Sequence, residues 1–335
     1  MTTDKKKWVA AAVFWCALLP AAAPAQISPA TVEAAKKEGE VMFYGAITIN
    51  ASKAIGDLFE KRYGIKLRHW RGDATELINR SLAEARAGRP GFDVTLGNEV
   101  VVTALNERNL FADFEPPAAK SFPKQFRTAE RRMTPWRVLP YGLNYNNRLL
   151  KPAEAPRRWE DLAEPKWKGK FGMANPGIHV TTLQFVLNLE KLLGPKWVSV
   201  VEGWAKQEPR LGRSLSDTIQ PLTAGEVQVA IGYIKDKYQF PGPIEYVRMD
   251  RYLASVSYVA INRQAPHPNA ARLFADFFLG PEAQKVFGDL GEYVFHPEVE
   301  HRFKKDVRDD QIVVMSLPAK AELESWGRKL REMFK

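Results

Sequence analysis

The sequence predicts an α/β protein built as two lobes, each a mixed β-sheet flanked by helices. Residues 41–105 alternate short apolar runs with helical patterns across polar turns, a rhythm typical of a sheet covered by helices. The roughly 310 residues that follow the first 25 favour two domains. Two late extended segments, 244–249 and 256–261, can carry the chain back to the first lobe, and two crossing strands would form a hinge.

The first 25 residues have the three parts of a secretory signal peptide. Lysines at 5–7 precede an apolar run at 8–19, and small residues at 23 and 25 suit a signal peptidase. Twelve helical residues at about 1.5 Å each cannot cross a hydrocarbon core about 30 Å thick. We therefore expect export to the periplasm with no membrane anchor, and a mature chain that begins at Gln26.

Composition excludes several classes of function for the mature chain. The single cysteine, Cys16, lies in the signal segment, so we expect no disulfide, cysteine nucleophile, iron–sulfur cluster or cysteine zinc site. Removing residues 1–25 leaves 46 Lys and Arg against 38 Asp and Glu, a net charge of +8. No dense basic run with interleaved aromatic residues is present, so a nucleic-acid partner is not expected.

The first lobe is expected over residues 26–142. Ser28 and Pro29 are typical of a helix start, and Gly39 of its end. Three strand–helix units follow, with strands expected at 41–44, 65–70 and 92–96. Residues 114–140 are rich in proline, arginine and aromatic residues without periodicity, which predicts a rim or connecting region.

The second lobe is expected over residues 143–252 and the return to the first lobe over 253–335. Residues 141–145 form the expected crossing segment. In the second lobe, a short helix is expected at 159–162, strands at 170–174 and 227–233, and helices at 178–193 and 216–224. In the return, helices are expected at 270–278, 281–290 and 319–333.

A search for catalytic and metal-binding signatures favours a protein that is not an enzyme. The sequence has no G-x-S-x-G, H-E-x-x-H, Walker or G-x-G-x-x-G motif. His296, Glu298, Glu300 and His301 are four potential metal ligands, but Pro297 and the spacing of the histidines oppose a shared helical face. We expect a surface loop there and no cofactor.

The positive functional signal is the repeated polar turn between a strand and a helix. In α/β sheets, ligands bind beyond the carboxyl ends of strands, where helix N-termini offer free N–H groups. Each turn alone is better explained as a helix cap, but the recurrence in both halves favours a cleft. Arg71 and Arg213 would suit a carboxylate or phosphate, or else a solvent-facing ion pair. The candidate ligand-binding residues are Tyr44, Gly45, Thr48, Asn50, Trp70, Arg71, Asn98, Glu99, Tyr141, His179, Thr181, Thr182, Arg213, Ser214, Ser216 and Tyr233.

The chain resembles the ferric-ion-type subgroup of bacterial extracellular solute-binding proteins, over nearly all of its length after residue 25. The most specific match combines W-x-D-L at 159–162 with P-K-W-K-G-K at 165–170. Weaker matches are residues 41–45, 92–94, 224–227, 268–271 and 277–284. The resemblance implies a type II periplasmic-binding fold, a ligand held between the lobes, and an inner-membrane ABC permease with its ATPase as partner of a monomer.

The resemblance leaves the ligand open. The paired tyrosines of ferric members would fall at 233 and 234, where this sequence has Tyr233 and Ile234. Glu99 matches an acidic position that some members use, so Tyr233 and Glu99 are the candidate metal ligands if the cargo is ferric ion. We rank an anionic organic or phosphorylated solute first, ferric ion second, and a secreted enzyme on the same fold third.

Overall fold

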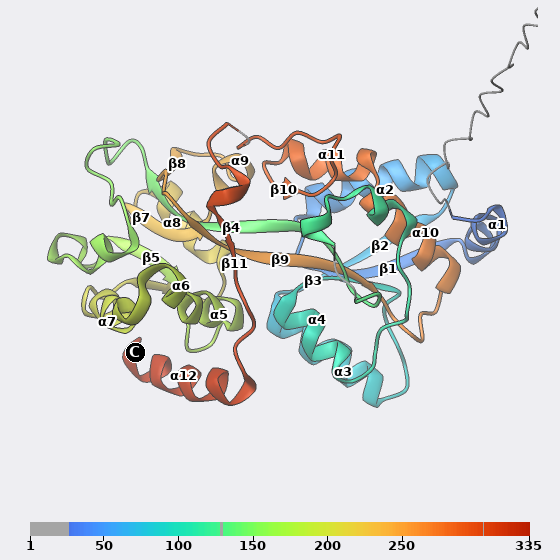
Figure 1. Ribbon diagram of the computed structural model, residues 1–335, viewed down its shortest axis with the longest axis horizontal. Coiled ribbons are helices and arrows are strands. Elements are labelled where there is room, and N and C mark those ends of the chain that lie inside the picture. Colours follow the sequence, from blue (N-terminus) through green and yellow to red (C-terminus); the bar gives the residue numbers. More distant parts are fainter. Residues whose placement is uncertain (1–26, 128–129, 304) are drawn as a thin grey trace, which may run out of the picture.

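A computed structural model describes residues 27–127, 130–303 and 305–335 of the chain (Figure 1). Within these residues, eleven strands form one mixed sheet, with the order β2-β1-β3-β9-β4-β7-β5-β6 along its main path. Strands β1 to β3 lie in a first lobe and β5 to β8 in a second, with β4 and β9 running between them (Figure 1). The strands are β1 Glu40–Gly45, β2 Lys66–Arg71, β3 Val94–Asn98, β4 Thr134–Asn146, β5 Phe171–Ala174, β6 Arg210–Gly212, β7 Val229–Tyr233, β8 Ile244–Tyr246, β9 Tyr252–Ile261, β10 Tyr293–Val294 and β11 Ile312–Val314.

Strand β4 belongs to both lobes. Its first half pairs with β9, from Thr134 opposite Val259 to Pro140 opposite Ala254. Its second half pairs with β7, beginning with Tyr141 opposite Tyr233. Strand β9 in turn pairs with β3 of the first lobe. The expected pair of crossing strands is therefore present, and it is part of one continuous sheet.

The expected rim region at 114–140 is wrong at its C-terminal end, because β4 begins at Thr134. Two prolines hid the strand, since a proline has no N–H for the ladder and is unusual inside a sheet. The structure accommodates Pro135 where the register with β9 shifts between Pro135 and Arg137, which is the kind of irregularity that tolerates proline. All thirteen residues of β4 are buried.

Helices cover both faces of the first lobe, and their N-caps follow from the sequence. Thr48, Asp73 and Asn98 each accept a hydrogen bond from the backbone N–H three residues on, which starts helices α2, α3 and α4. Figure 1 shows α3 and α4 on one face and α1, α2 and α10 on the other. The helices are α1 Pro29–Glu38, α2 Ile49–Tyr63, α3 Ala74–Arg86, α4 Glu99–Asn106, α10 Pro268–Leu279 and α11 Pro281–Asp289.

The second lobe packs its helices around an aromatic core. The indole N–H of Trp204 donates to the carbonyl of Trp159 at 2.9 Å, and Phe185 packs on Trp159 at 5.1 Å between ring centroids. The expected helix at 159–162 is a 3-10 helix, Trp159–Ala163. The remaining helices are α5 Val180–Asn188, α6 Glu190–Leu193, α7 Trp197–Lys206, α8 Ser216–Ala224, α9 Asp236–Gln239 and α12 Lys320–Met333.

Helix α12 packs against the second lobe (Figure 1). Trp326 contacts Trp197 of α7 at 4.7 Å between ring centroids, and the Arg331 guanidinium donates to the carbonyl of Gly177. The approach is close, because a Cβ on Gly177 would lie 2.6 Å from the Cα of Arg331. Upstream of α12, β11 pairs with β9. The segment 315–319 is thus a third connection across the lobes.

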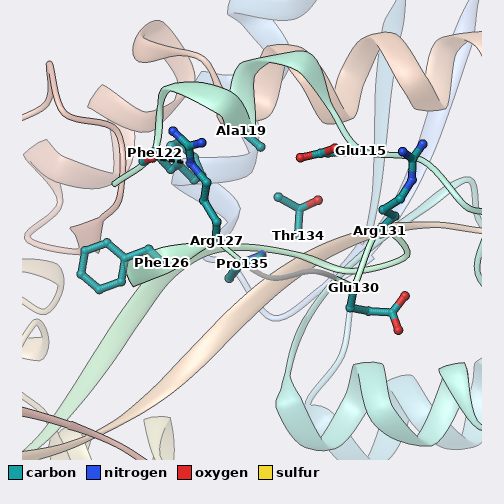
Figure 2. Close-up of a pocket in the computed structure, with 9 residues that line it drawn as sticks. All are labelled: Glu115, Ala119, Phe122, Phe126, Arg127, Glu130, Arg131, Thr134 and Pro135. Atoms are coloured by element: carbon teal, nitrogen blue, oxygen red, sulfur yellow. Dashed lines mark hydrogen bonds between the residues drawn. The ribbon is translucent and has the colours of Figure 1, made fainter. Parts of the chain in front are cut away.

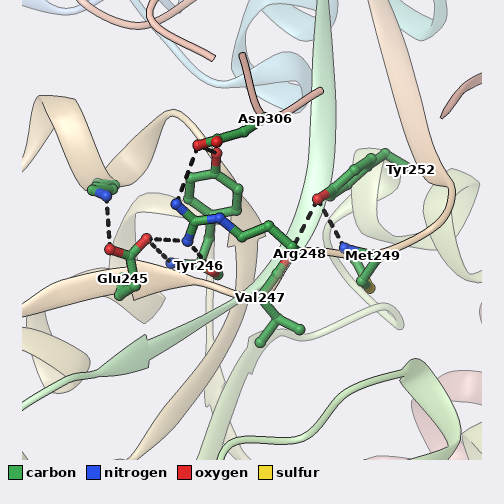
Figure 3. A network of polar contacts seen from close by, with 8 residues as sticks. Glu245, Tyr246, Val247, Arg248, Met249, Tyr252 and Asp306 are labelled. Atoms are coloured by element: carbon green, nitrogen blue, oxygen red, sulfur yellow. Dashed lines mark hydrogen bonds and ion pairs between the residues drawn. The ribbon is translucent and has the colours of Figure 1, made fainter. Parts of the chain in front are cut away.

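A polar network joins the segment around residue 306 to β8 (Figure 3). The Tyr246 hydroxyl donates to Asp306 at 2.7 Å, and Arg248 donates to Asp306 at 3.1 Å. Arg248 and Lys237 both donate to the carboxylate of Glu245, at 2.6 and 2.7 Å. Glu245 is therefore a carboxylate held between two cations, and it is partly exposed at 21%.

The expected signal peptide and Cys16 lie outside the residues that the structure describes. Among the described helices, none has the length and apolar composition needed to cross a membrane. Most expected helices and strands of the rest of the chain are present within a few residues of their expected bounds, with α8 at Ser216–Ala224 as one example.

Candidate solute-binding site between the lobes

A cavity of about 590 Å³ lies where strand ends of both lobes meet helix starts. Its volume falls in the ordinary range for small-molecule sites. Five polar turns between a strand and a helix, at residues 45–50, 70–75, 97–99, 175–182 and 212–216, all contribute to its wall. The polar and charged lining residues are Thr48, Arg71, Asp73, Glu76, Asn98, Arg137, His179, Thr181, Ser214, Ser216, Asp217, Gln220, Tyr233, Lys235, Asp236, Gln239, Ser257 and Glu292.

The first-lobe wall is made by the N-termini of α2, α3 and α4. Strand β1 pairs in parallel with both β2 and β3, so the carboxyl ends of all three strands lie at one edge. The helices that follow therefore start side by side, at Thr48, Asp73 and Asn98. Free N–H groups and the positive end of each helix dipole favour an anion at such an edge.

The second-lobe wall is made by the N-termini of α5 and α8 and the end of β7. His179 caps α5: its Nδ1 accepts the backbone N–H of Thr182 at 3.3 Å. Burial lowers the pKa of His179, so the imidazole is neutral near pH 7. Because Nδ1 is an acceptor, the proton is on Nε2, which makes His179 a neutral hydrogen-bond donor.

The two walls touch at one side of the cavity. The side-chain amide of Asn98 in the first lobe donates to the hydroxyl of Thr181 in the second at 2.9 Å. Beside it, the amide of Gln184 donates to the carboxylate of Glu99 at 3.1 Å. Gln184 also donates to the carbonyl of Ser316 at 3.3 Å, in the third connection between the lobes. The lobes are therefore joined by hydrogen bonds next to the site.

Arg71 is the exposed cation of the cavity. It ends β2 and lines the wall. Within the part of the chain that the structure describes, no carboxylate pairs with its guanidinium. The nearby acids on the wall are occupied: Asp73 and Glu76 accept each other's backbone N–H, and Asp217 accepts those of Arg213 and Ser214. Arg71 is thus available to a ligand.

A buried charged cluster forms another part of the cavity wall. Arg137 of β4 forms an ion pair with Glu292 and donates to the hydroxyl of Ser257 at 3.1 Å. Glu292 also accepts the amide of Gln239 at 2.8 Å and lies 3.6 Å from the Lys235 ammonium. The side chains of Arg137, Lys235 and Glu292 are only 9%, 12% and 4% exposed. These cavity residues were not predicted from the sequence.

The protonation of the buried cluster follows from its burial. Burial lowers the pKa of Lys235 to about 8 and raises that of its neighbour Asp236 to about 6, while the two opposite charges partly compensate each other. Asp236 also accepts the backbone N–H of Tyr233 at 3.0 Å. Near pH 7, Lys235 and Asp236 are both mainly charged.

Two tyrosines meet beside this cluster. The hydroxyls of Tyr141 and Tyr233 lie 3.5 Å apart, although the residues are distant in sequence. Burial is the largest cause of the raised pKa of each phenol, so both are protonated near pH 7. The chain thus has a second tyrosine beside Tyr233, supplied by β4 and not by the next residue.

Half of the sixteen candidate residues lie on the cavity wall. They are Thr48, Arg71, Asn98, His179, Thr181, Ser214, Ser216 and Tyr233. The other eight, Tyr44, Gly45, Asn50, Trp70, Glu99, Tyr141, Thr182 and Arg213, are not lining residues.

Packing and capping explain most of these other positions. The Tyr44 hydroxyl donates to Glu84 at 2.9 Å, and its ring packs on Trp70 within the first lobe. Gly45 permits close strand approach, because a Cβ there would lie 3.0 Å from that of Leu96. Asn50 is exposed at the second helical position of α2, two residues past the N-cap Thr48.

The remaining four also have local partners. Glu99 accepts a hydrogen bond from Gln184 and does not line the cavity, whereas Tyr233 does. The two candidate metal ligands therefore do not share the cavity wall. Tyr141 is buried, stacks on Phe185 at 4.3 Å and donates to the carbonyl of Thr181 at 3.4 Å. Thr182 is bonded to His179. Arg213 is exposed and contributes its backbone N–H to Asp217.

A second cavity of about 290 Å³ lies in the first lobe, beside the start of β4 (Figure 2). It is lined by Phe122, Phe126, Thr134 and Pro135 together with charged side chains. Arg127 in its wall donates to the carbonyls of Phe122 and Lys120, so its donors are used by its own loop. This cavity has no helix N-termini from two lobes, unlike the larger one.

One sheet shared by two lobes, with a cavity at the strand ends between them, is the architecture of a type II periplasmic-binding protein. Residues 54–310 match the family described as bacterial extracellular solute-binding protein, and the chain belongs to that family.

Relatives and solved structures agree with this class. The chain is 22% identical over 287 residues to the "Probable ABC transporter periplasmic-binding protein y4fP" of Sinorhizobium fredii, covering 81% of this chain and 80% of that one. It is 25% identical to the Fe(3+)-binding periplasmic protein of Serratia marcescens, over 60% of this chain and 59% of that one. The structure of the periplasmic binding protein AfuA from Actinobacillus pleuropneumoniae, with exogenous fructose-6-phosphate bound, has a TM-score of 0.69 at 19% identity, over 88% and 96% of the chains. The expected fold class and family are therefore confirmed.

Proposed function

We propose that this protein is the periplasmic receptor of an ABC importer and that it captures a small anionic organic solute, such as a phosphate ester, between its lobes. The observation that carries the proposal is the convergence of five helix N-terminal turns on one cavity, which also contains Arg71, a cation with no ion-pair partner among the described residues. Delivery to an inner-membrane permease with its ATPase follows from the family and from the name of the Sinorhizobium relative.

The donors of the cavity suit an anion with several oxygen atoms. Backbone N–H groups at the starts of α2, α3 and α4 face one side, and the hydroxyls of Ser214 and Ser216 lie on the other. The neutral His179 adds an N–H donor without a charge. Arg71 supplies the planar fork of donors that matches phosphate or carboxylate geometry. A solved protein of this fold holds fructose-6-phosphate, which is a ligand of this chemical class.

Ferric ion is the second candidate, because a relative from Serratia marcescens binds Fe(3+) and because Tyr141 and Tyr233 are close together. A hard trivalent cation needs anionic oxygen ligands. Here the raised pKa values keep both phenols protonated, and the cations Arg137 and Lys235 lie in the same cavity wall. Burial opposes the formation of two phenolates, and Fe³⁺ would then lie close to two cations that repel it, so the anionic solute ranks first.

A binding role is favoured over catalysis, because the family and the relatives named above are binding proteins. The cavity gives a receptor what it needs: donors from both lobes, which make more contacts to a ligand in a closed state than in an open one. Such differential contact shifts the population towards closure.

Isothermal titration calorimetry with fructose 6-phosphate, inorganic phosphate and ferric citrate tests the proposal. We expect the organic phosphate to bind and Arg71→Gln to weaken it by about 10- to 150-fold, since a hydrogen bond to a charged group contributes about 1.5–3 kcal/mol. Arg213→Gln is the matched control, because Arg213 is exposed and outside the cavity wall. Tight binding of ferric ion with a phenolate absorption band, and no response to the phosphates, would contradict the proposal.

A further inference from the structure

The buried end of the cavity carries a balanced set of charges. Two cations, Arg137 and Lys235, face two carboxylates, Glu292 and Asp236. Glu292 is central, because one of its oxygens pairs with Arg137 while the other accepts from Gln239 and faces Lys235. Glu292 comes from the first-lobe segment after α11, whereas Lys235 and Gln239 come from the second lobe. The protein therefore supplies its own counter-ion at this end.

The outer end of the cavity has the opposite character. Arg71 lies there without an ion-pair partner among the described residues, next to the starts of α2 and α3. Arg71 and Arg137 are on β2 and β4, which are four strand spacings apart in the sheet. At about 4.8 Å for each spacing, their backbones are roughly 19 Å apart along the sheet. The Arg71 side chain nevertheless reaches close enough to Lys235 for its charge to help lower the pKa of Lys235. The cavity therefore runs from a cationic end at Arg71 to an adjoining buried end whose charges balance.

We propose that Glu292 is a specificity-determining residue, which makes the buried end accept an uncharged polar part of the solute and reject a second anionic group. This inference rests on the proposed function and refines it: the preferred solute has one anionic group, bound near Arg71, and a hydroxyl-rich or amide-rich body. Ser257, Gln239 and Tyr233 offer uncharged hydrogen-bonding groups for that body. A second phosphate would instead lie beside the carboxylates of Glu292 and Asp236, which already balance the two cations of this end, so the buried second charge would have no counter-ion.

The test compares the dissociation constants of fructose 6-phosphate and fructose 1,6-bisphosphate by calorimetry. The wild-type protein is expected to prefer the monophosphate. Glu292→Gln leaves the buried end with one excess positive charge, so the preference should shift towards the bisphosphate by about tenfold or more. Lys235→Gln leaves one excess negative charge and should shift it the other way. The double variant restores the balance and should return towards the wild-type preference.

Glu245→Gln is the matched control. Glu245 is also a carboxylate between two cations, since it accepts from Lys237 and from Arg248, but it is outside the cavity wall. Figure 3 shows Glu245 and Arg248. Its variant should leave the preference unchanged. Circular dichroism establishes folding, and Lys235→Gln decides the outcome if Glu292→Gln does not fold.

The outcomes separate the two proposals. If both esters bind and the preference is the same in the wild type, Glu292→Gln and Lys235→Gln, the role of Glu292 is refuted and the receptor function stands. If neither ester binds the wild-type protein, the proposed solute class itself is refuted.

Discussion

Lys235 makes the affinity of the cavity depend on pH. Burial lowers its pKa to about 8, so it loses its proton between pH 7 and 9, while a phosphate ester, with its second pKa near 6, keeps its charge. The cluster of Arg137, Lys235, Asp236 and Glu292 then becomes negative, and Arg71 alone attracts the anion. We expect affinity for fructose 6-phosphate to fall about tenfold over this range, equivalent to about 1.4 kcal/mol.

Calorimetry at pH 7, 8 and 9 measures this effect. The Lys235→Gln variant should bind the ester more weakly at pH 7 and lose no further affinity up to pH 9. An equal loss of affinity in this variant would assign the effect to another group.

The free energy of unfolding should change with pH in the direction opposite to the affinity. Because the pKa of Lys235 is lower in the folded protein than in the unfolded chain, the unfolded chain binds more protons between about pH 8 and 10.5, and this residue's contribution to stability rises there with pH.

At the scale of single residues, the sequence predicts those site residues that are next to a recognisable turn. Thr48, Asn98 and Ser216 follow strand ends and precede apolar helical patterns, and all three line the cavity. Glu292 and Ser257 carry no such local signal. They reach the cavity through strand pairing between segments more than 100 residues apart, such as Arg137 opposite Ser257, and a single sequence does not reveal that pairing.

At the scale of elements, two glycines give opposite predictions for helix α12. Gly177→Ala would place a Cβ 2.6 Å from the backbone of Arg331, so α12 must shift. Overpacking of this kind costs about 1–3 kcal/mol. Gly327→Ala would meet Leu183 at an ordinary 3.5 Å, and alanine in a helix is better than glycine by about 0.5–1 kcal/mol.

Hydrogen exchange of α12 amides measures both changes. We expect faster exchange in Gly177→Ala and slower exchange in Gly327→Ala. Equal protection in the two variants would mean that α12 is not held by this contact.

Helix ends are largely predictable because their signals are local, as the N-cap at Ser28 shows. The sequence favours Asn50 as the N-cap of α2, whereas the structure has Thr48 two residues earlier. Strand β4 was partly hidden because Pro135 and Pro140 interrupt its pattern, and only pairing with β9 and β7 makes it a strand. The amphipathic pattern of residues 319–333 predicts a helix, but nothing in it indicates that α12 packs on the second lobe or that residues 315–319 connect the lobes. That packing depends on residues far away in sequence, such as Trp197 and Gly177.

At the scale of the whole molecule, the hydrogen bond between Asn98 and Thr181 stabilises the arrangement in which the lobes touch. Thr181→Val keeps the side-chain shape and removes the acceptor. One hydrogen bond contributes about 0.5–1.5 kcal/mol, so we expect affinity for the solute to fall about 2- to 12-fold. Small-angle scattering should show a larger radius of gyration without ligand and the same compact form at saturation.

Thr223→Val is the control for this variant, because the Thr223 hydroxyl donates to the carbonyl of Gln220 within its own helix. If Thr181→Val has the same scattering curve and affinity as the wild type, the contact between the lobes contributes nothing to closure.

The two-lobed architecture could be predicted from the rhythm of the sequence and from its family resemblance, whereas the arrangement of the lobes could not. Five polar turns were recognisable one by one. Their meeting at one cavity depends on the strand order β2-β1-β3-β9-β4-β7-β5-β6. In this order β9 lies between β3 and β4, and it is more than 100 residues away from both in the sequence.

That strand order also sets the sequence of events during synthesis. Strand β3, complete at Asn98, has β9 as its second neighbour, and β9 begins only at Tyr252. Until then an open edge of the first lobe has no partner, and pairing across so long a loop is slow. A ribosome must therefore translate about three quarters of the message before the first lobe can complete its sheet.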